Sequence, residues 1–235
     1  MKQPPNGRPE GFAIVEKLLR KIGAASWLEV GTTRQRDDMG AGYSTPFFAW
    51  LASETGSTFC SVDIKPSVIE TARAILRDLG LESFATLVCA DAREYVQKLK
   101  HANPEGKVLA MVYLDALDYD GDDDAKSWSE LWHLLLFNDV EPLLADGAVV
   151  LIDDVYGTET FEGKGRLLIP SLLERGYECV HRGYQFVFIK PSAAFKPYTI
   201  ELTEPTEPIT TPEETTSDAE PPATATEEQG AESGA

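Results

Sequence analysis

Several features that mark common protein classes are missing from this 235-residue sequence. Its three cysteines, Cys60, Cys89 and Cys179, lie far apart within apolar runs, so there is no C-x-x-C pair for zinc or redox chemistry. No stretch approaches the roughly 18 uninterrupted apolar residues of a membrane helix. The first residues lack the continuous apolar core of a signal peptide. We therefore expect a cytoplasmic protein with reduced, buried thiols and no membrane association.

Positive charge is scarce. The chain has 21 Lys and Arg residues against 39 Asp and Glu residues, a net charge of −18. Residues 199–235 carry ten acidic residues and no Lys or Arg, which leaves −8 for residues 1–198. Neither part has a basic stripe that could neutralise phosphates, so we expect no nucleic-acid partner. An anionic membrane surface would repel the chain for the same reason.

Apolar stretches of strand length recur along the sequence, and most are separated by segments with helical periodicity. This alternation is typical of a mostly parallel sheet with helices on both faces. Gly183 alone separates the last two stretches, so they should pair as an antiparallel hairpin. The sequence therefore predicts a Rossmann-like, doubly wound α/β sheet of seven strands. The expected strands are Trp27–Thr32, Thr58–Ile64, Ala85–Ala90, Val108–Asp115, Ala148–Asp153, Tyr177–Arg182 and Tyr184–Lys190.

After Pro191 the composition changes to Thr, Glu, Pro, Ala and Ser, with almost no large apolar residues. Such a segment buries too little surface to offset its chain entropy. We expect one domain over residues 1–192 and a disordered acidic tail over residues 193–235.

The strand ends are where ligands bind in a doubly wound sheet. No G-x-G-x-x-G follows the first strand, which removes the usual pyrophosphate site of dinucleotide-binding proteins. Ser44 or Thr45 can instead cap a helix whose free amides suit a carboxylate. Asp63 is placed to accept hydrogen bonds from ribose hydroxyls. Asp91 either accepts from an adenine amino group or caps the helix that follows it.

Three carboxylates follow two neighbouring strands: Asp115 after the fourth, and Asp153 and Asp154 after the fifth. Like charges that converge in this way raise one another's pKa unless a cation neutralises them. Oxygen ligands alone favour a hard ion, so these residues predict a Mg²⁺ site. In the alternative, Asp154 turns outward and Asp115 only orients the bound ligand.

In the order of these short motifs, the sequence resembles the class I S-adenosylmethionine-dependent methyltransferases. Within them it is most similar to the catechol O-methyltransferase-like and macrocin O-methyltransferase-like groups. The resemblance covers residues 23–190. The matching pieces are E-V-G at 29–31, G-Y-S-T at 42–45, S-V-D-I at 61–64, C-A-D-A at 89–92, Y-L-D at 113–115 and L-I-D-D at 151–154.

The resemblance implies a position for each part of the cofactor. Glu29 and Gly31 would line its methionine and ribose side, and Ser44 with neighbouring amides, Thr45 among them, would hold its carboxylate. Asp63 would bind the ribose, with Ile64 against the adenine ring and Asp91 and Ala92 at the adenine edge. Asp115, Asp153 and Asp154 would be the metal ligands, with Asp115 also near the cofactor.

Two departures from the family bear on catalysis. The loop at 32–41 is longer than usual, and its Arg34, Arg36, Asp37 and Asp38 either close over the ligands or are solvated. The catechol group has a lysine three residues after its fourth-strand aspartate, where this chain has Asp118, which leaves Asp118 or Tyr156 as the general base.

We expect Mg²⁺-assisted O-methylation of a small hydroxylated molecule. Metal-independent N- or O-methylation and a noncatalytic binding protein are the alternatives, and a homodimer stays open. The segment 163–166, G-K-G-R, either offers positive charge to an acidic acceptor or is a flexible start of the helix Leu167–Arg175.

Overall fold

The computed structural model of the chain describes residues 8–36 and 43–192. The expected acidic tail and the loop residues Asp37 and Asp38 lie outside the described residues. No helix in the described ranges is long and apolar enough to cross a membrane.

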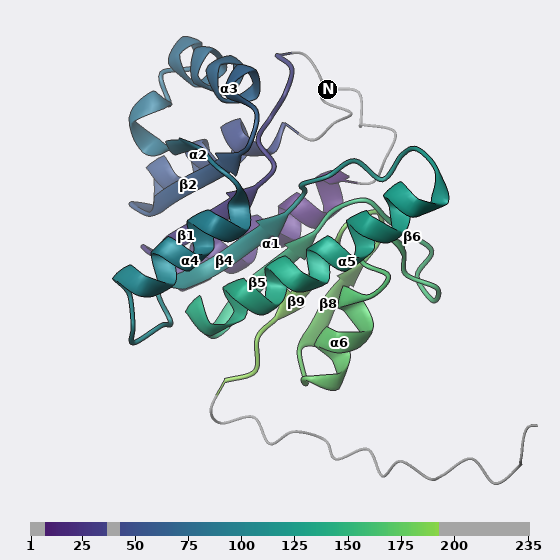
Figure 1. Ribbon diagram of the computed structural model, residues 1–235. Helices are drawn as coiled ribbons and strands as arrows, with labels where there is room; N and C mark the ends of the chain where they lie inside the picture. The colour runs from purple at the N-terminus through teal and green to yellow at the C-terminus, as the bar shows by residue number, and fades with distance from the viewer. Residues whose placement is uncertain (1–7, 37–42, 193–235) are drawn as a thin grey trace, which may run out of the picture. The chain divides into compact units, whose positions relative to one another are not determined.

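The described residues form a seven-stranded sheet with the strand order β3-β2-β1-β4-β5-β9-β8 (Figure 1). The first five strands along the chain pair in parallel, whereas β9 is antiparallel to both β5 and β8. The predicted mixed sheet with its C-terminal hairpin is therefore confirmed. The strands are β1 (Ser26–Val30), β2 (Thr58–Asp63), β3 (Thr86–Cys89), β4 (Leu109–Leu114), β5 (Leu144–Ile152), β8 (Glu178–Arg182) and β9 (Phe186–Ile189).

Two differences from the prediction exceed a shift of one or two residues at a strand end. The fifth strand begins at Leu144 rather than Ala148, because Leu144 already pairs with Leu109 across a register shift. A separate two-stranded sheet, β6 (Val155–Tyr156) and β7 (Glu162–Gly163), follows β5. Two paired residues per strand are too short to leave a period-2 pattern in the sequence.

Helices cover both faces of the sheet (Figure 1). Strand neighbours such as Trp27 and Leu28 point into opposite hydrophobic clusters, as the two-residue period of a strand requires. Helices α1 and α2 contribute to one cluster, and α4, α5 and α6 to the other. The helices are α1 (Arg8–Ile22), α2 (Ser44–Thr55), α3 (Pro66–Asp78), α4 (Ala92–Ala102), α5 (Asp123–Val140) and α6 (Leu168–Glu174), with 3-10 turns at Glu82–Phe84 and Glu141–Leu143.

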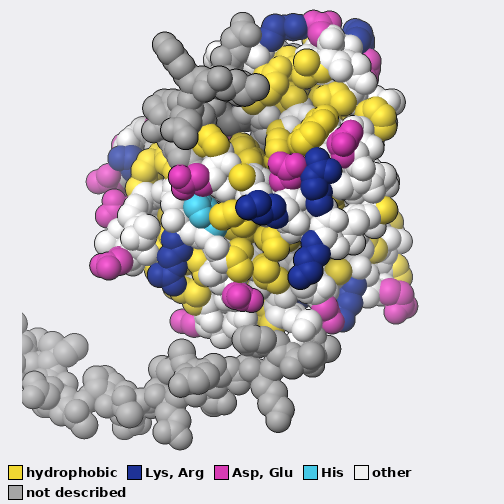
Figure 2. Space-filling view, turned by 180° about the vertical axis from the view of Figure 1, so that it is seen from behind, with side chains coloured by type: hydrophobic (Ala, Val, Ile, Leu, Met, Phe, Trp, Pro, Cys, Tyr) yellow, Lys and Arg dark blue, Asp and Glu magenta, His cyan; other side chains and the backbone are white. Residues whose placement is uncertain are grey.

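Charged side chains of both signs are interspersed on the face shown in Figure 2, among exposed hydrophobic side chains. The absence of a nucleic-acid partner stays a prediction from the charge balance.

The order of the strands determines where a ligand can bind. β1 lies between β2 and β4, and the chain runs outward from it in opposite directions on its two sides. Loops after β1 and β4 therefore diverge at the carboxyl edge of the sheet and leave a crevice there.

Candidate active site

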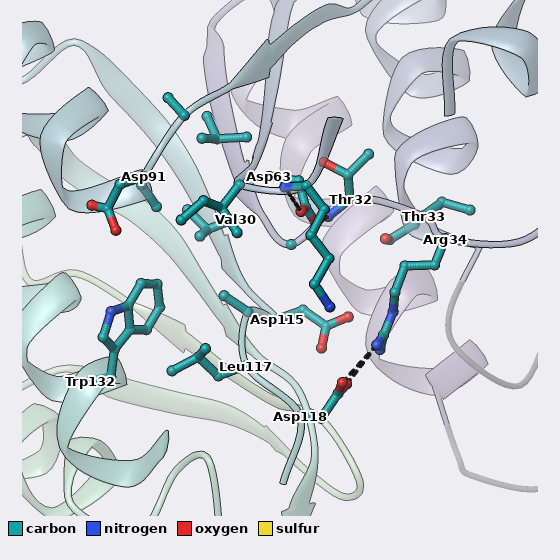
Figure 3. A pocket seen from close by; sticks show the side chains of 18 residues that line it. Val30, Thr32, Thr33, Arg34, Asp63, Asp91, Asp115, Leu117, Asp118 and Trp132 are labelled. Atoms are coloured by element: carbon teal, nitrogen blue, oxygen red, sulfur yellow. Dashed lines mark hydrogen bonds and ion pairs between the residues drawn. The ribbon is translucent and has the colours of Figure 1, made fainter. Parts of the chain in front are cut away.

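A cavity opens at this crevice, beyond the carboxyl ends of β1, β2, β3 and β4 (Figure 3). Most residues that the sequence predicted for the cofactor line its wall. They are Gly31, Ser44, Asp63, Ile64, Asp91, Ala92 and Asp115. Asp118, a predicted base, lines it too.

Gly31 allows the ends of β1 and β4 to come together at the base of the cavity. Its φ of +94° lies in the left-handed region, and a Cβ there would come within 2.2 Å of the Asp115 carbonyl oxygen. The Gly31 amide also donates to the Val62 carbonyl oxygen at 3.0 Å. A side chain at this position would therefore separate strands that must be adjacent.

Glu29 and Thr45 support the cavity instead of lining it, and their predicted contact with the cofactor stays a prediction. The Glu29 carboxylate is fully buried and accepts hydrogen bonds from Thr45 Oγ1 at 2.6 Å and Ser61 Oγ at 2.5 Å. Thr45 is in turn joined to Thr33 by two hydrogen bonds. Burial raises the pKa of Glu29 to about 7, although the hydroxyl donors around it oppose the shift. The carboxylate therefore holds the loop after β1 against α2.

Asp63 and Asp91 take the strand-end positions expected of them. Asp63 accepts from the backbone amides of Thr32 at 3.2 Å and Lys65 at 2.9 Å. Asp91 caps α4 through the amides of Arg93 and Glu94, and it also faces the cavity. The two readings of Asp91 are thus compatible, because a carboxylate has lone pairs for more than two donors.

Trp132 is a cavity residue that the sequence did not reveal. It comes from α5, and Figure 3 shows its indole across the cavity from Val30, on the same side as Asp91. In the sequence it lies among Leu131, Leu134 and Leu135, so it was indistinguishable from residues that pack against the sheet.

Asp118 and Arg34 form an ion pair at the cavity (Figure 3), with Nη1 of Arg34 2.7 Å from Oδ1 of Asp118. Arg34 is therefore a cavity residue rather than part of a freely solvated loop. Tyr156, the other predicted base, does not line this cavity; its ring packs between those of Tyr119 and Tyr184.

The three predicted metal ligands do come together. Asp115, Asp153 and Asp154 each offer a carboxylate oxygen within 4.8 Å of the others. Asp154 does not turn outward, because its carboxylate binds Arg8 and Lys164 in the cluster. Its backbone has a left-handed φ of +50°.

Two cations already occupy this acid centre. Lys164 Nζ lies 2.6 Å from Oδ1 of Asp115 and 2.8 Å from Oδ2 of Asp154. Arg8, at the start of α1, binds both oxygens of Asp153 and Oδ1 of Asp154 at 2.8 to 3.1 Å.

Two tyrosines complete the partners of the acid centre. Tyr113 donates to Oδ2 of Asp115 at 3.1 Å, and Tyr184 donates to Oδ1 of Asp154. All six carboxylate oxygens thus have a partner within the protein. The sequence could not reveal Arg8, which is 145 residues from Asp153. It presented Lys164 as part of a basic segment that either offers charge to an acidic acceptor or begins a helix, not as a partner of Asp115 and Asp154.

The charges of this centre shift one another's pKa. Burial, and then Asp153, raises the pKa of Asp115 well above its usual value. Burial alone would lower the pKa of Lys164, but the surrounding carboxylates outweigh it and raise that pKa. Asp154 has a lowered pKa, because Lys164, Tyr184 and Arg8 together overcome its burial. The carboxylates therefore favour the charged form of Lys164 in spite of its burial.

Residues 38–155 match the model of a protein family described as a methyltransferase domain. The chain belongs to this methyltransferase family. The resemblance to class I S-adenosylmethionine-dependent methyltransferases is thereby confirmed. A search of curated proteins finds no significant match to the sequence.

Solved structures share the fold of this methyltransferase. An O-methyltransferase from Bacillus cereus, in complex with SAH, matches at 17% identity and a TM-score of 0.56, over 77% of this chain and 81% of the other. The O-methyltransferase TomG from Streptomyces achromogenes, in complex with SAM, matches at 18% identity and a TM-score of 0.56, over 81% of this chain and 83% of the other. Cofactor-bound Rv0187 from MTB matches at 17% identity and a TM-score of 0.57, over 78% of this chain and 80% of the other.

The acid centre of the methyltransferase does not fit Mg²⁺ as it stands. Mg²⁺ needs ligand oxygens at about 2.0–2.1 Å in an octahedron. The Lys164 ammonium lies between Asp115 and Asp154, where such an ion would have to bind. The ion and the ammonium cannot share these oxygens, because their like charges repel at close range.

Proposed function

We propose that this methyltransferase takes its methyl group from S-adenosylmethionine and transfers it to an oxygen of a small hydroxylated molecule. The observation that supports this most is the cavity at the carboxyl ends of β1–β4, in which acidic side chains follow successive strands. Two of the structures with the same fold are O-methyltransferases in complex with SAM or SAH.

The cavity residues fit the parts of this cofactor. The carboxylate of Asp63 suits the ribose hydroxyls, because each of its oxygens has a lone pair beyond those used by Thr32 and Lys65. Asp91 and Trp132 offer an acceptor and an aromatic surface to the adenine. Gly31 and Ser44 also line the cavity and are left for the methionine part, supported by the hydrogen-bonded Glu29 and Thr45. The bound cofactor would supply a methyl group activated by its sulfonium.

We favour the metal-independent form of the reaction over the Mg²⁺-assisted form expected from the sequence. Lys164 and Arg8 already neutralise most of the charge on Asp115, Asp153 and Asp154. The proton of the acceptor hydroxyl must then leave to a side chain. Asp118 is the best placed, because it is on the cavity wall and partly open to solvent, with 44% of its side chain exposed.

Calorimetry and a methyl-transfer assay test the proposal. We expect saturable binding of S-adenosylmethionine, weakened in Asp63→Asn and unchanged in Asp120→Asn, a neighbouring exposed acid outside the cavity. Transfer of a labelled methyl group to a panel of hydroxylated small molecules should be the same with and without EDTA.

Each failure has a separate meaning. No cofactor binding would refute the methyl donor, whereas products methylated only on nitrogen would refute the acceptor class. Turnover that stops in EDTA and returns with Mg²⁺ would restore the metal-assisted form.

A further inference from the structure

Lys164 is held in the acid centre by its own backbone. Its side chain is fully buried, and its amide donates to the Asp154 carbonyl oxygen at 3.2 Å. The preceding residue, Gly163, pairs with Val155 across the small β6–β7 sheet. The lysine is therefore placed directly beside the carboxylates by a short antiparallel turn.

The two glycines around Lys164 are closely packed, and Gly163 has steric and conformational reasons to be glycine. Gly163 has a φ of +96°, and a Cβ on it would come within 2.0 Å of the Asp154 carbonyl oxygen. A Cβ on Gly165 would come within 2.5 Å of Ile169 Cδ1 on α6. The segment that looked flexible in the sequence is thus packed on both sides, and the position of the ammonium follows from it.

The ammonium of Lys164 binds the carboxylate oxygens that Arg8 and the two tyrosines do not use. Arg8 occupies both oxygens of Asp153 and one of Asp154, and Tyr113 donates to the outer oxygen of Asp115. The oxygens left between Asp115 and Asp154 are the two that Lys164 binds. With two cations against three carboxylates, the formal charge of the centre is −1 when all three are ionised, and a divalent ion added to it would make the total positive.

We propose that Lys164 is a built-in replacement for a divalent cation: its ammonium holds the carboxylates of Asp115 and Asp154 together, and so keeps Asp115 on the wall of the cofactor cavity. Lys164 is a positioning residue, because it is fully buried and reaches the cavity only through Asp115. The link to catalysis rests on the proposed function, but the exclusion of metal does not.

Metal binding by the full-length chain, without cofactor, tests this directly. Titration with Mn²⁺, followed by the electron paramagnetic resonance of the free ion, should show no specific site in the wild-type protein. Lys164→Ala vacates the position and should bind one Mn²⁺ per chain, ~10-fold or more tightly than the wild type, because a repelling charge is gone. Lys164→Arg should stay without a site. Lys107→Ala, which removes an exposed lysine paired with Asp146, is the matched control and should not bind either.

The proposal would be overturned if the wild-type protein bound one Mn²⁺ and Asp153→Asn abolished that binding. A folded Lys164→Ala chain that binds no Mn²⁺ would also overturn it. If Lys164→Ala does not fold, as its circular dichroism would show, the wild-type and Asp153→Asn titrations still decide the question. A chain that excludes Mn²⁺ but binds no S-adenosylmethionine would refute the proposed function and leave the replacement of the metal supported.

Discussion

Glu29 illustrates what a single buried carboxylate does in this protein. It lies beneath the proposed cofactor cavity, and its partners are hydroxyl groups rather than a cation. Three donors oppose the cost of burial without cancelling it, so the pKa of Glu29 rises from 4.5 to about 7. Buried carboxylates can also be stabilised by cations, as in the acid centre of Asp115, Asp153 and Asp154, where the cations come from distant parts of the chain.

The raised pKa of Glu29 predicts a pH-dependent stability. Above pH 4.5 the unfolded chain releases this proton more readily than the folded chain, so stability falls as the pH rises and has fallen fully once the pH is above 7. The total loss is about 3 kcal/mol, at 1.36 kcal/mol per pKa unit. Glu29→Gln keeps acceptors for Thr45 and Ser61 but does not ionise, so it should lack this part of the slope.

Urea unfolding of wild type and Glu29→Gln between pH 5 and 8 measures this difference, and other titrating groups cancel in the comparison. Parallel stability curves for the two proteins would show that Glu29 is ionised as easily in the folded state as in the unfolded state.

Asp118 carries the prediction on catalysis. If Asp118 takes the proton from the hydroxyl group that is methylated, Asp118→Asn should lower kcat by about 10²–10⁴, the usual contribution of a general base. Its affinity for S-adenosylmethionine should change little, because the ion pair with Arg34 is solvent-exposed and weak. Kinetics beside those of Asp120→Asn check this, and a normal kcat for Asp118→Asn would remove it from the mechanism.

At the scale of elements, the site depends on where strands end and how closely those ends approach. β1 and β4 end side by side, and the contact between Gly31 and the backbone of Asp115 sets their spacing at the cavity. β6 and β7 set the position of Lys164 in the acid centre, since their pairing brings it back to the end of β5. Short backbone contacts thus place the functional groups.

Gly31→Ala tests this spacing, with Gly147→Ala as its control. Both glycines have positive φ, +94° and +77°, but a Cβ on Gly147 would meet no atom within 4 Å. Gly147→Ala should cost about 1 kcal/mol of backbone strain. Gly31→Ala adds the clash with the Asp115 carbonyl and should cost about 2–4 kcal/mol. Equal unfolding free energies for the two variants, measured in urea, would contradict the role given to this contact.

At the scale of the whole molecule, the acid centre joins segments from both ends of the described chain. Arg8 at the start of α1 binds Asp153 after β5, and it also stacks on the ring of Tyr184, which precedes β9. The N-terminal helix is therefore fastened to the end of the sheet that carries the site.

Arg8→Ala should consequently destabilise the whole fold. It leaves the fully buried Asp153 without its cation, and breaking a buried ion pair from one side costs about 3–5 kcal/mol. Arg20→Ala, on the same helix, removes only the exposed pair with Glu16 and should cost less than about 1 kcal/mol. Denaturant midpoints of the two variants give the comparison. A loss in Arg8→Ala no larger than in Arg20→Ala would show that α1 is held by its apolar face alone.

The sequence alone determined the sheet, the hairpin and the strand-end residues, because these follow from local periodicity and from the rule that places ligands beyond parallel strands. Gly31, Asp63, Asp91 and Asp115 could be chosen for the site in this way, whereas Asp118 came from the comparison with the catechol group. Trp132 could not, since its helical spacing matches that of core residues.

Only the tertiary structure decided the charge state of the acid centre. The convergence of Asp115, Asp153 and Asp154 was predictable, but the cations that meet them come from α1 and from the turn after β7. Neither distance along the chain nor local pattern carries that information. Electrostatic pairing in a buried site depends on which charges the fold brings within a few ångströms, and a sequence shows the charges without those distances.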